Sequence, residues 1–324
     1  MLSFETILEK IEEEIKSLAF DYPPKSLYEP IEYILSLGGK RIRPALVLLA
    51  CNLYRDQVDA AVAPALGLEV FHNFTLLHDD LMDEADKRRN RPTVHKVWNA
   101  NTAILSGDAM LIAAYQLIAA TDAPYLKEVL DLFTATALEI CGGQQYDMEF
   151  EARLDVSEAE YMEMIRLKTA VLLACSLKTG ALLGGAPAAD ADRLYKVGIH
   201  IGLAFQLQDD LLDVYGDTAT FGKNIGGDIL CNKKTFLLVN ALRLASDEQR
   251  QTLSDWIAKE TFDPQAKIAA FTAIYDALDL KKLTENRMQH HYAEAMNYLN
   301  ALNVAPEKLT VLKNVCDRLM YRQS

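Results

Sequence analysis

HNFTLLHDDLMD (residues 72–83) and GLAFQLQDDLLD (residues 202–213) are two apolar stretches that each end in the pentad Asp-Asp-x-x-Asp. On a helix, the first and fifth residues of such a pentad lie on one face, one turn apart. Like charges at this spacing repel, but carboxylates together with substrate phosphates are the usual ligands of Mg²⁺. Two solvated acidic helix ends are the alternative, which two matched copies disfavour. The pattern predicts Mg²⁺ bound for phosphate-ester chemistry by Asp79, Asp80, Asp83, Asp209, Asp210 and Asp213.

Apolar residues with a helical period extend outward from these stretches over most of the chain. They predict an N-terminal helix, a short helix from Ile31 to Leu37 opened by Pro30, and a further set after residue 247. No alternating strand pattern, linker or low-complexity tract interrupts them. The sequence therefore predicts an all-α fold and a single domain over residues 1–324. The longer internal helices are expected at about 60–82, 101–120, 124–152, 158–184, 190–215 and 233–246.

Composition narrows the class of function. The net charge is −13 and the pI about 5.0, which argues against a nucleic-acid surface. Five dispersed cysteines without CxxC pairs are typical of reduced thiols. The acidic N-terminus does not resemble a signal peptide, and no stretch reaches the roughly 18 apolar residues of a membrane span. We therefore expect a cytoplasmic protein with no nucleic-acid partner and no stable membrane insertion.

Two basic segments suit a diphosphate. GGKRIRP (residues 38–44) places Lys40, Arg41 and Arg43 after two glycines, where they can make charge-assisted hydrogen bonds to phosphate. The alternative is a helix end whose cations complement the dipole. KRRNRP (residues 87–92) follows the first pentad, and its Arg88 and Arg89 either neutralise the aspartates or hold phosphate in bidentate contacts. Beside two metal clusters, we favour phosphate binding for both segments.

Isolated polar residues give weaker signals. His72 lies two turns before Asp79 and faces the same side of its helix. Lys168 and Thr169 interrupt an apolar helix, although a lone lysine is usually a surface residue. DTATFGKNIGGD (residues 217–228) suits either a lid over a phosphate site or a plain loop between helices.

The motifs of this chain occur in the order seen in trans-isoprenyl diphosphate synthases. In sequence order they are GGKRIRP, the first pentad, KRRNRPTVH, GQQYD, KT, the second pentad, GKNIGGDI and NKKT. Over about residues 38–235 the chain resembles this family, and most of all its short-chain geranylgeranyl and farnesyl diphosphate synthases. The resemblance implies the isoprenoid-synthase helical bundle, with both aspartate clusters facing a deep central cavity, and a homodimer. It also implies a prenyltransferase that condenses isopentenyl diphosphate with dimethylallyl, geranyl or farnesyl diphosphate. Mg²⁺-assisted ionisation, condensation and elimination would give a C15–C20 all-trans prenyl diphosphate and diphosphate.

The same resemblance assigns residues to two substrate sites. Mg²⁺ on both pentads would bind the allylic diphosphate, with direct contacts from Arg88, Lys168, Thr169, Gln206, Lys223 and Lys233. Isopentenyl diphosphate would contact Lys40, Arg43, His72 and Arg89, with Arg41 as a neighbour. Gln144 and Asp147 would line the cavity and order metal-bound water. The catalytic set would be Asp79, Asp80, Asp83, Lys168, Asp209, Asp210 and Lys223.

Product length in this family depends on residues that precede the first pentad on the same helix. Phe74 should obstruct a growing chain and Thr75 leaves space beside it, which indicates a C20 or C15 product. The chain departs from the family's pattern at Asn90 and Asn232, where glycine is common and the local turns could change. The alternatives are a medium- or long-chain polyprenyl diphosphate synthase, a class I terpene cyclase, or a non-catalytic subunit of a heteromeric synthase. The GGKR segment speaks against a cyclase, and the six retained aspartates against a non-catalytic subunit.

Overall fold

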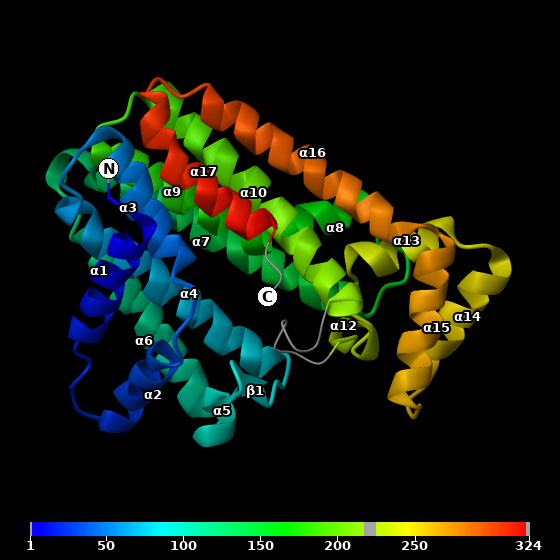
Figure 1. Ribbon diagram of the computed structural model, residues 1–324. Coiled ribbons are helices and arrows are strands. Elements are labelled where there is room, and N and C mark those ends of the chain that lie inside the picture. The colour runs from blue at the N-terminus through cyan, green and yellow to red at the C-terminus, as the bar shows by residue number, and fades with distance from the viewer. Residues whose placement is uncertain (1, 217–224, 322–324) are drawn as a thin grey trace. The chain divides into compact units, whose positions relative to one another are not determined.

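The computed structural model describes residues 2–216 and 225–321, and in these ranges helices are the main element (Figure 1). The prediction of an all-α fold is confirmed, with two strands of two residues each as the exception. The helices are α1 Phe4–Ser17, α2 Lys25–Ser36, α3 Ile42–Tyr54, α4 Val62–Met82, α5 Val94–Val97, α6 Ala100–Ala119, α7 Ala123–Glu151, α8 Glu158–Ile165, α9 Val171–Gly184, α10 Ala188–Tyr215, α12 Gly227–Leu230, α13 Phe236–Leu244, α14 Asp247–Ala258, α15 Pro264–Ala277, α16 Leu280–Asn300 and α17 Pro306–Met320. A 3₁₀ turn, η1, covers Asp59–Ala61, a π-helical turn, η2, covers Arg166–Ala170, and the strands are β1 Lys87–Arg88 and β2 Arg91–Pro92.

The internal helices begin and end within about three residues of the expected positions, because their apolar stripes are long and regular. The second helix is different. It begins at Lys25 and contains Pro30, so the prediction that Pro30 opens a short helix is wrong. Pro30 lies early enough in α2 that its missing N–H costs only one hydrogen bond near the start of the helix.

The described chain divides into two compact units. The first comprises Met1–Thr134, Cys175–Leu194 and Asn303–Leu312, and the second comprises Ala135–Ala174, Tyr195–Leu302 and Lys313–Ser324. The single domain over residues 1–324 stays a prediction. The first unit carries the first pentad and the second unit carries the second.

In the first unit, α4 is the central helix, and it packs against α3 and α6. Its buried face includes Leu68, Val70 and Phe71, each of which contributes about 1.5–3 kcal/mol by leaving water. At Gly107 of α6 an added Cβ would lie 2.1 Å from Nε2 of His78 on α4, so only glycine permits this approach. The close contact fixes the C-terminal half of α4, which is the half that carries the predicted site residues.

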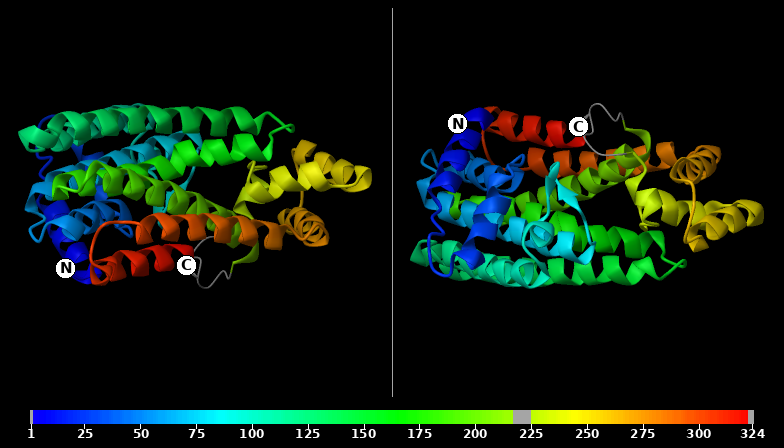
Figure 2. Two further views of the ribbon diagram at one scale, coloured as in Figure 1. Left: turned by 90° about the horizontal axis from the view of Figure 1, so that it is seen from above. Right: turned by 90° about the horizontal axis from the view of Figure 1, so that it is seen from below.

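In the second unit, close backbone approaches surround the start of the Lys168-Thr169 segment. A Cβ on Gly143 of α7 would lie 2.4 Å from the backbone nitrogen of Lys168, and one on Gly202 of α10 would lie 2.4 Å from Cα of Ala170. The π turn η2 occupies this same segment, and π turns inside helices are frequent at functional sites. Elsewhere in this unit α14 lies beside α15, and α15 beside α16, as both views of Figure 2 show in yellow and orange.

Among the described helices, three segments are long and apolar enough to cross a membrane by length and composition: Asp59–Met82, Ala100–Ala119 and Glu158–Gly184. The prediction that no stretch meets this criterion is therefore wrong. In the most apolar 18 residues of each segment, the share that is buried inside the protein is 67% for the first segment and 78% for the third, but only 33% for the segment in α6. The apolar character of α6 thus needs another explanation than the core of its own unit.

Candidate active site

The first pentad lies at the C-terminal end of α4, where its three carboxylates have unequal surroundings. Asp80 is buried, whereas Asp79 is half-buried and Asp83 is exposed. Arg88 donates from Nε to both carboxylate oxygens of Asp80, at 2.9 and 2.8 Å, and its Nη2 lies 2.7 Å from Oδ1 of Asp80 and 3.6 Å from Oδ2 of Asp79. Burial raises the pKa of Asp80, and the paired guanidinium opposes that shift. Asp80 is therefore the most buried member of this pentad, and Arg88 balances its charge.

A two-residue hairpin brings Arg88 to this position. β1 and β2 pair antiparallel, with Arg88 opposite Arg91, and the turn between them consists of Arg89 and Asn90. Both turn residues have positive φ, 51° and 62°, as tight hairpin turns of this length require. Asn90 thus adopts the left-handed conformation that glycine favours, and Asn232 does so as well, with a φ of 56°. Asparagine tolerates this region better than most residues, so both local turns form without glycine.

A cluster of cations in the first unit lies around the Gly38–Arg43 segment. Nη1 of Arg43 lies 3.0 Å from Nε2 of His72, and Arg89 donates from Nη1 to the backbone oxygen of Gly38. Burial and the neighbouring arginines keep the pKa of His72 well below its usual value, so this ring is neutral at pH 7. Burial also lowers the pKa of Arg43 to about 10, which leaves the guanidinium charged. Nε of Arg43 is buried without a partner in the described structure, as expected of a site that awaits an anion.

Arg41 is a buried residue. Only 4% of it is exposed, and its guanidinium donates to Glu12 of α1 (2.9 Å), Glu69 of α4 (2.8 Å) and the backbone oxygen of Leu35 in α2 (2.9 Å). Three of its five N–H groups have partners within the protein, and the guanidinium is buried. These contacts indicate a structural role for Arg41, and its predicted contact with the diphosphate stays a prediction. Lys40, its neighbour, is exposed.

Phe74 and Thr75 lie on α4 between His72 and the pentad. The Phe74 ring is half-buried and lies 5.4 Å from the Phe71 ring and 4.8 Å from the His78 ring, measured between centroids. The hydroxyl of Thr75 donates to the backbone oxygen of His72 at 2.8 Å, so its polar group is used within the helix. Phe74 is thus one of a row of rings on α4, and its half-exposed edge is what a bound apolar chain would meet.

In the second pentad, near the C-terminal end of α10, Asp210 and Asp213 are buried and Asp209 is half-buried. Asp210 is buried and accepts hydrogen bonds from the Tyr161 hydroxyl, the Phe236 backbone N–H (2.8 Å) and Nε2 of Gln206 (3.3 Å). Burial raises the pKa of Asp210 to about 7. Oδ2 of Asp213 accepts the backbone N–H of Asp228 at 3.1 Å. Both buried aspartates of this pentad therefore accept hydrogen bonds from the protein.

A small polar cavity of about 50 Å³ lies beside Asp210 in the second unit. Nζ of Lys168 donates to Asp147 at 2.6 Å, Nζ of Lys233 lies 4.0 Å from the same oxygen, and the Thr169 hydroxyl donates to Gln206 at 3.1 Å. Burial would raise the pKa of Asp147, but the charges of Lys233 and Lys168 lower it overall. The structure thus brings together, within one unit, most residues predicted to contact the allylic diphosphate: Lys168, Thr169, Gln206, Lys233 and the water-ordering Asp147. Lys223 lies outside the described residues.

The donor chemistry of the pentads fits Mg²⁺, which prefers oxygen ligands and keeps several waters or phosphate oxygens. Within residues 2–216 and 225–321, no three His, Cys, Asp or Glu side chains are placed to hold a metal ion by themselves. A site of one or two carboxylates completed by substrate phosphate agrees with both observations. The predicted Mg²⁺ ligands include two pairs spaced one helical turn apart, Asp79 with Asp83 and Asp209 with Asp213.

The polyprenyl synthetase family model matches residues 24–274 of the chain. The chain belongs to the polyprenyl synthetase family. It is 41% identical over 246 residues to a short chain isoprenyl diphosphate synthase of Methanothermobacter thermautotrophicus, which covers 76% of each chain. It is 35% identical over 302 residues to a geranylgeranyl diphosphate synthase of Methanosarcina mazei, covering 93% of this chain and 91% of that one. A crystal structure of a geranylgeranyl pyrophosphate synthase is similar over 100% of both chains, with 41% identity and a TM-score of 0.94.

Several contacts of this polyprenyl synthetase site escaped the sequence analysis. Tyr161 lacks a motif and meets Asp210 across 49 residues of sequence. Glu69 resembles any helical glutamate until its partner Arg41 is known. Lys234 is buried and donates to the backbone oxygens of Glu151 and Asn232. In the sequence it looks the same as its neighbour Lys233 in the NKKT segment, so this structural role could not be predicted. A polar residue in an otherwise buried helical stripe was the available signal for Glu69 and Tyr161.

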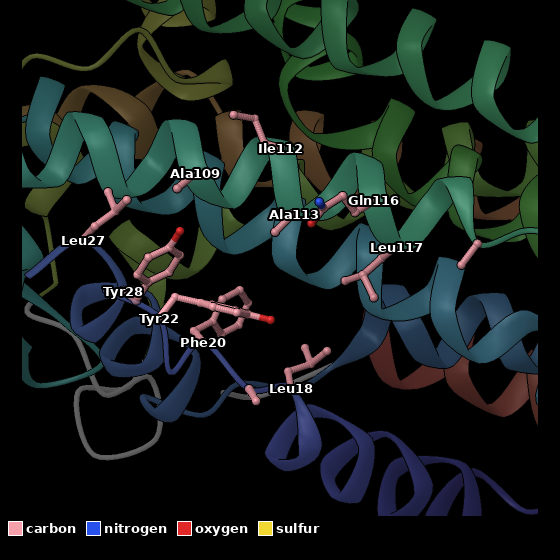
Figure 3. A pocket seen from close by; sticks show the side chains of 12 residues that line it. Leu18, Phe20, Tyr22, Leu27, Tyr28, Ala109, Ile112, Ala113, Gln116 and Leu117 are labelled. Carbon is pink, nitrogen blue, oxygen red and sulfur yellow. The ribbon is translucent and has the colours of Figure 1, made fainter. Parts of the chain in front are cut away.

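A larger hollow in the first unit is unlike a diphosphate site. It has a volume of about 590 Å³ and lies between the 18–28 segment and one side of α6. Its walls carry no charged side chain among the described lining residues, and Figure 3 shows Tyr22 and Tyr28 beside the small residues Ala109 and Ala113 of α6. Such a surface suits apolar contacts, not phosphate.

Proposed function

We propose that this protein is a trans-prenyltransferase that condenses isopentenyl diphosphate with an allylic diphosphate to give a C15–C20 prenyl diphosphate and diphosphate. The observation that carries this proposal is the anion-binding group of Arg43, neutral His72 and Arg89, which belongs to the same unit as Asp79 and Asp80. An enzyme acting on one diphosphate needs a metal cluster alone. A second anion site, without a metal-binding carboxylate in it, supports a second diphosphate that stays intact during the reaction.

The residues divide the two tasks. Isopentenyl diphosphate would be bound by Lys40, Arg43, His72 and Arg89. Arg43 remains charged and can pair with the diphosphate, and the neutral ring of His72 does not repel the Arg43 guanidinium. Lys168, Thr169, Gln206, Lys233 and Lys223 would contact the allylic diphosphate. Bound Mg²⁺, held by aspartates of both pentads, would supply Lewis-acid stabilisation of the negative charge on the leaving group.

The bond changes follow from this arrangement. The allylic C1–O bond breaks, and its electron pair leaves with the diphosphate, where fixed cations such as Lys168 stabilise the developing charge. The C4 alkene carbon of isopentenyl diphosphate then bonds to the allylic C1. Loss of a proton from C2, taken up by the released diphosphate, restores a double bond. Apolar side chains such as Phe71 and Phe74 would exclude water, which would otherwise trap the allylic cation.

Chain length is proposed to be limited at Phe74, with C20 or C15 as the product. The relatives named above are short-chain and geranylgeranyl synthases, which supports the shorter range. A medium- or long-chain synthase would need a larger open space beside α4 than a half-exposed phenyl ring leaves.

We also propose that the protein acts as a homodimer in the cytoplasm. The exposed apolar side chains Ile104 (44%), Leu105 (59%) and Ile112 (62%) on α6 support a dimer, because monomers rarely leave such a helix face in water. Sedimentation velocity of the wild type and of Leu105→Glu tests this assembly, and a monomeric wild type would contradict it.

The decisive experiment supplies purified protein and Mg²⁺ with isopentenyl diphosphate and, in turn, dimethylallyl, geranyl or farnesyl diphosphate. We expect C15–C20 prenyl diphosphates, identified by chromatography after dephosphorylation. Diphosphate release without isopentenyl diphosphate would indicate a cyclase, and chains of thirty carbons or more a long-chain synthase. No release with any allylic substrate would indicate a non-catalytic subunit.

A further inference from the structure

Three helices meet at the guanidinium of Arg41, next to the cation cluster but turned away from it. Arg41 and Glu69 are both about 97% buried, with 3% of each side chain exposed, and their Nη1 and Oε1 atoms are 2.8 Å apart. Asn73, one turn further along α4, donates to the same carboxylate oxygen at 3.2 Å. Nε of Arg41 donates to the carboxylate of Glu12 on α1, and Nη2 of Arg41 donates to the backbone oxygen of Leu35 near the C-terminal end of α2.

The backbone at Arg41 is what these contacts hold. Arg41 has φ 47° and ψ 33°, a left-handed conformation that is disfavoured for residues with a Cβ, and it directly precedes the first turn of α3. Gly38 and Gly39 before it also have positive φ, 78° and 142°. A chain with three such residues in four has little conformational preference of its own, so its path depends on the side chain that is anchored. Arg41 is that side chain.

The path of this segment decides where the substrate-binding groups point. Arg43 lies two residues beyond Arg41 and reaches His72, which is one turn beyond Glu69 on α4. Arg89 lies against Gly39, where an added Cβ would be 2.8 Å from Nη2, and donates to the oxygen of Gly38. A shift of the segment would therefore move Arg43 from His72 and Arg89 from Gly38 together.

Charge gives the pair a second effect. Glu69 is the carboxylate whose charge raises the pKa of both Arg43 and Arg89 against the lowering by burial. While Arg41 is present, two hydrogen bonds occupy Glu69. Without it, an unpaired buried carboxylate would attract Arg43 and compete with a diphosphate for it.

We propose that Arg41 and Glu69 are positioning residues for the isopentenyl diphosphate site: their buried ion pair fixes the left-handed Gly38–Arg41 turn and so aligns Arg43 with His72 and Arg89. This inference rests on the proposed function for the identity of the ligand, and on the geometry alone for the alignment. Neither residue touches the substrate.

The test is Arg41→Lys, which keeps the positive charge but replaces the planar guanidinium, with its donors in several directions, by a single ammonium group. We expect the KM for isopentenyl diphosphate to rise about tenfold or more, the usual effect of losing an outer partner of a binding group, while kcat and the KM for geranyl diphosphate stay within about twofold. Arg193→Lys is the matched control, because Arg193 also donates from Nη1 to a buried aspartate of the same unit, Asp190, at 2.7 Å. It should leave both KM values unchanged. Equal changes in both KM values, or a loss of kcat alone, would overturn the proposal.

Glu12→Gln is the milder variant in case Arg41→Lys does not fold, since Glu12 is 40% exposed and loses one contact only. We expect a smaller rise of the same KM, and no rise would also count against the alignment. A readout independent of substrate separates this inference from the proposed function. In histidine NMR titrations, with the signal assigned through His72→Gln, the pKa of His72 should be well below its usual value in the wild type and closer to that value in Arg41→Lys. If His72 shifts but the wild type makes no prenyl diphosphate, the proposed function fails and the positioning stands; if His72 does not shift, the positioning fails.

Discussion

Replacing Phe74 by alanine should lengthen the product by about one isoprene unit. The phenyl ring that is removed has six carbons, and an isoprene unit has five, so the space released fits one further unit. Burying four to five more carbons at about 0.8 kcal/mol each favours another condensation over release by roughly 3–4 kcal/mol, a factor of about several hundred. The main product should therefore move from C20 to C25, or from C15 to C20.

The substitution also has a cost in stability that the structure lets us bound. A fully buried Phe→Ala change costs about 3–5 kcal/mol. Phe74 is half-buried and keeps contact with Phe71 and His78, so we expect about 2 kcal/mol. Urea denaturation measures this loss, and a loss of that size leaves the enzyme folded at 25 °C. Product lengths can then be compared at equal amounts of folded protein.

The assay is product chromatography after incubation with dimethylallyl diphosphate, excess isopentenyl diphosphate and Mg²⁺. Phe20→Ala is the control, because Phe20 is also half-buried in the first unit but lines the hollow beside α6. It should not change product length. Thr75→Phe should act in the opposite direction and shorten the product. If folded, active Phe74→Ala protein gives the wild-type distribution, the idea that this ring limits elongation is refuted.

Three further outcomes follow from the aspartate clusters. Tyr161→Phe removes one donor to buried Asp210 and should lower the free energy of unfolding by about 1–2 kcal/mol in urea titrations. Burial raises the pKa of Asp210 to about 7, so the folded state keeps a proton that the unfolded state releases near pH 4. The contribution of Asp210 to the free energy of unfolding should therefore decline as pH rises from about 4 to 7. Asp210→Asn should flatten this part of the stability profile measured without metal, and an identical slope would contradict the assignment. Asp79→Ala and Asp209→Ala should each lower kcat by about 10²–10³, as should EDTA on the wild type, whereas isopentenyl diphosphate binding measured by calorimetry without metal should persist. Loss of that binding in the alanine variants would show that the two sites are not separate.

The helices and the position of the pentads could be predicted because both depend on local pattern. Apolar residues recur at helical spacing along α4 and α10, and each pentad lies at the end of such an apolar stripe. The hairpin at Arg88 could not be predicted in this way. Its turn lacks the glycine that usually marks such a hairpin, and a two-residue strand has no periodicity to detect.

The direction of each charged side chain was the other limit. GGKRIRP contains cations of equal appearance, yet Arg41 turns inward to Glu69 while Arg43 reaches His72. The difference depends on a left-handed backbone at Arg41 and on a glutamate 28 residues away. Neither is visible in the motif. Sequence patterns thus locate a site well, but they do not distinguish a residue that binds substrate from one that holds the binding residue.

The same distinction applies to the pentads and changes what the motif means. In both copies the second aspartate is buried and accepts hydrogen bonds from the protein: Asp80 is bound by Arg88, and Asp210 by Tyr161, Gln206 and Phe236. A carboxylate whose oxygens accept protein hydrogen bonds in a buried place must give them up before it can bind a metal, which costs about 1–3 kcal/mol for each donor left unsatisfied. Asp79 and Asp83 are less buried than Asp80, whereas Asp213 in the second copy is buried and accepts the backbone N–H of Asp228. In both copies the middle aspartate of DDxxD is therefore fixed by protein donors, while the outer pair at the spacing of one turn is predicted to bind the metal.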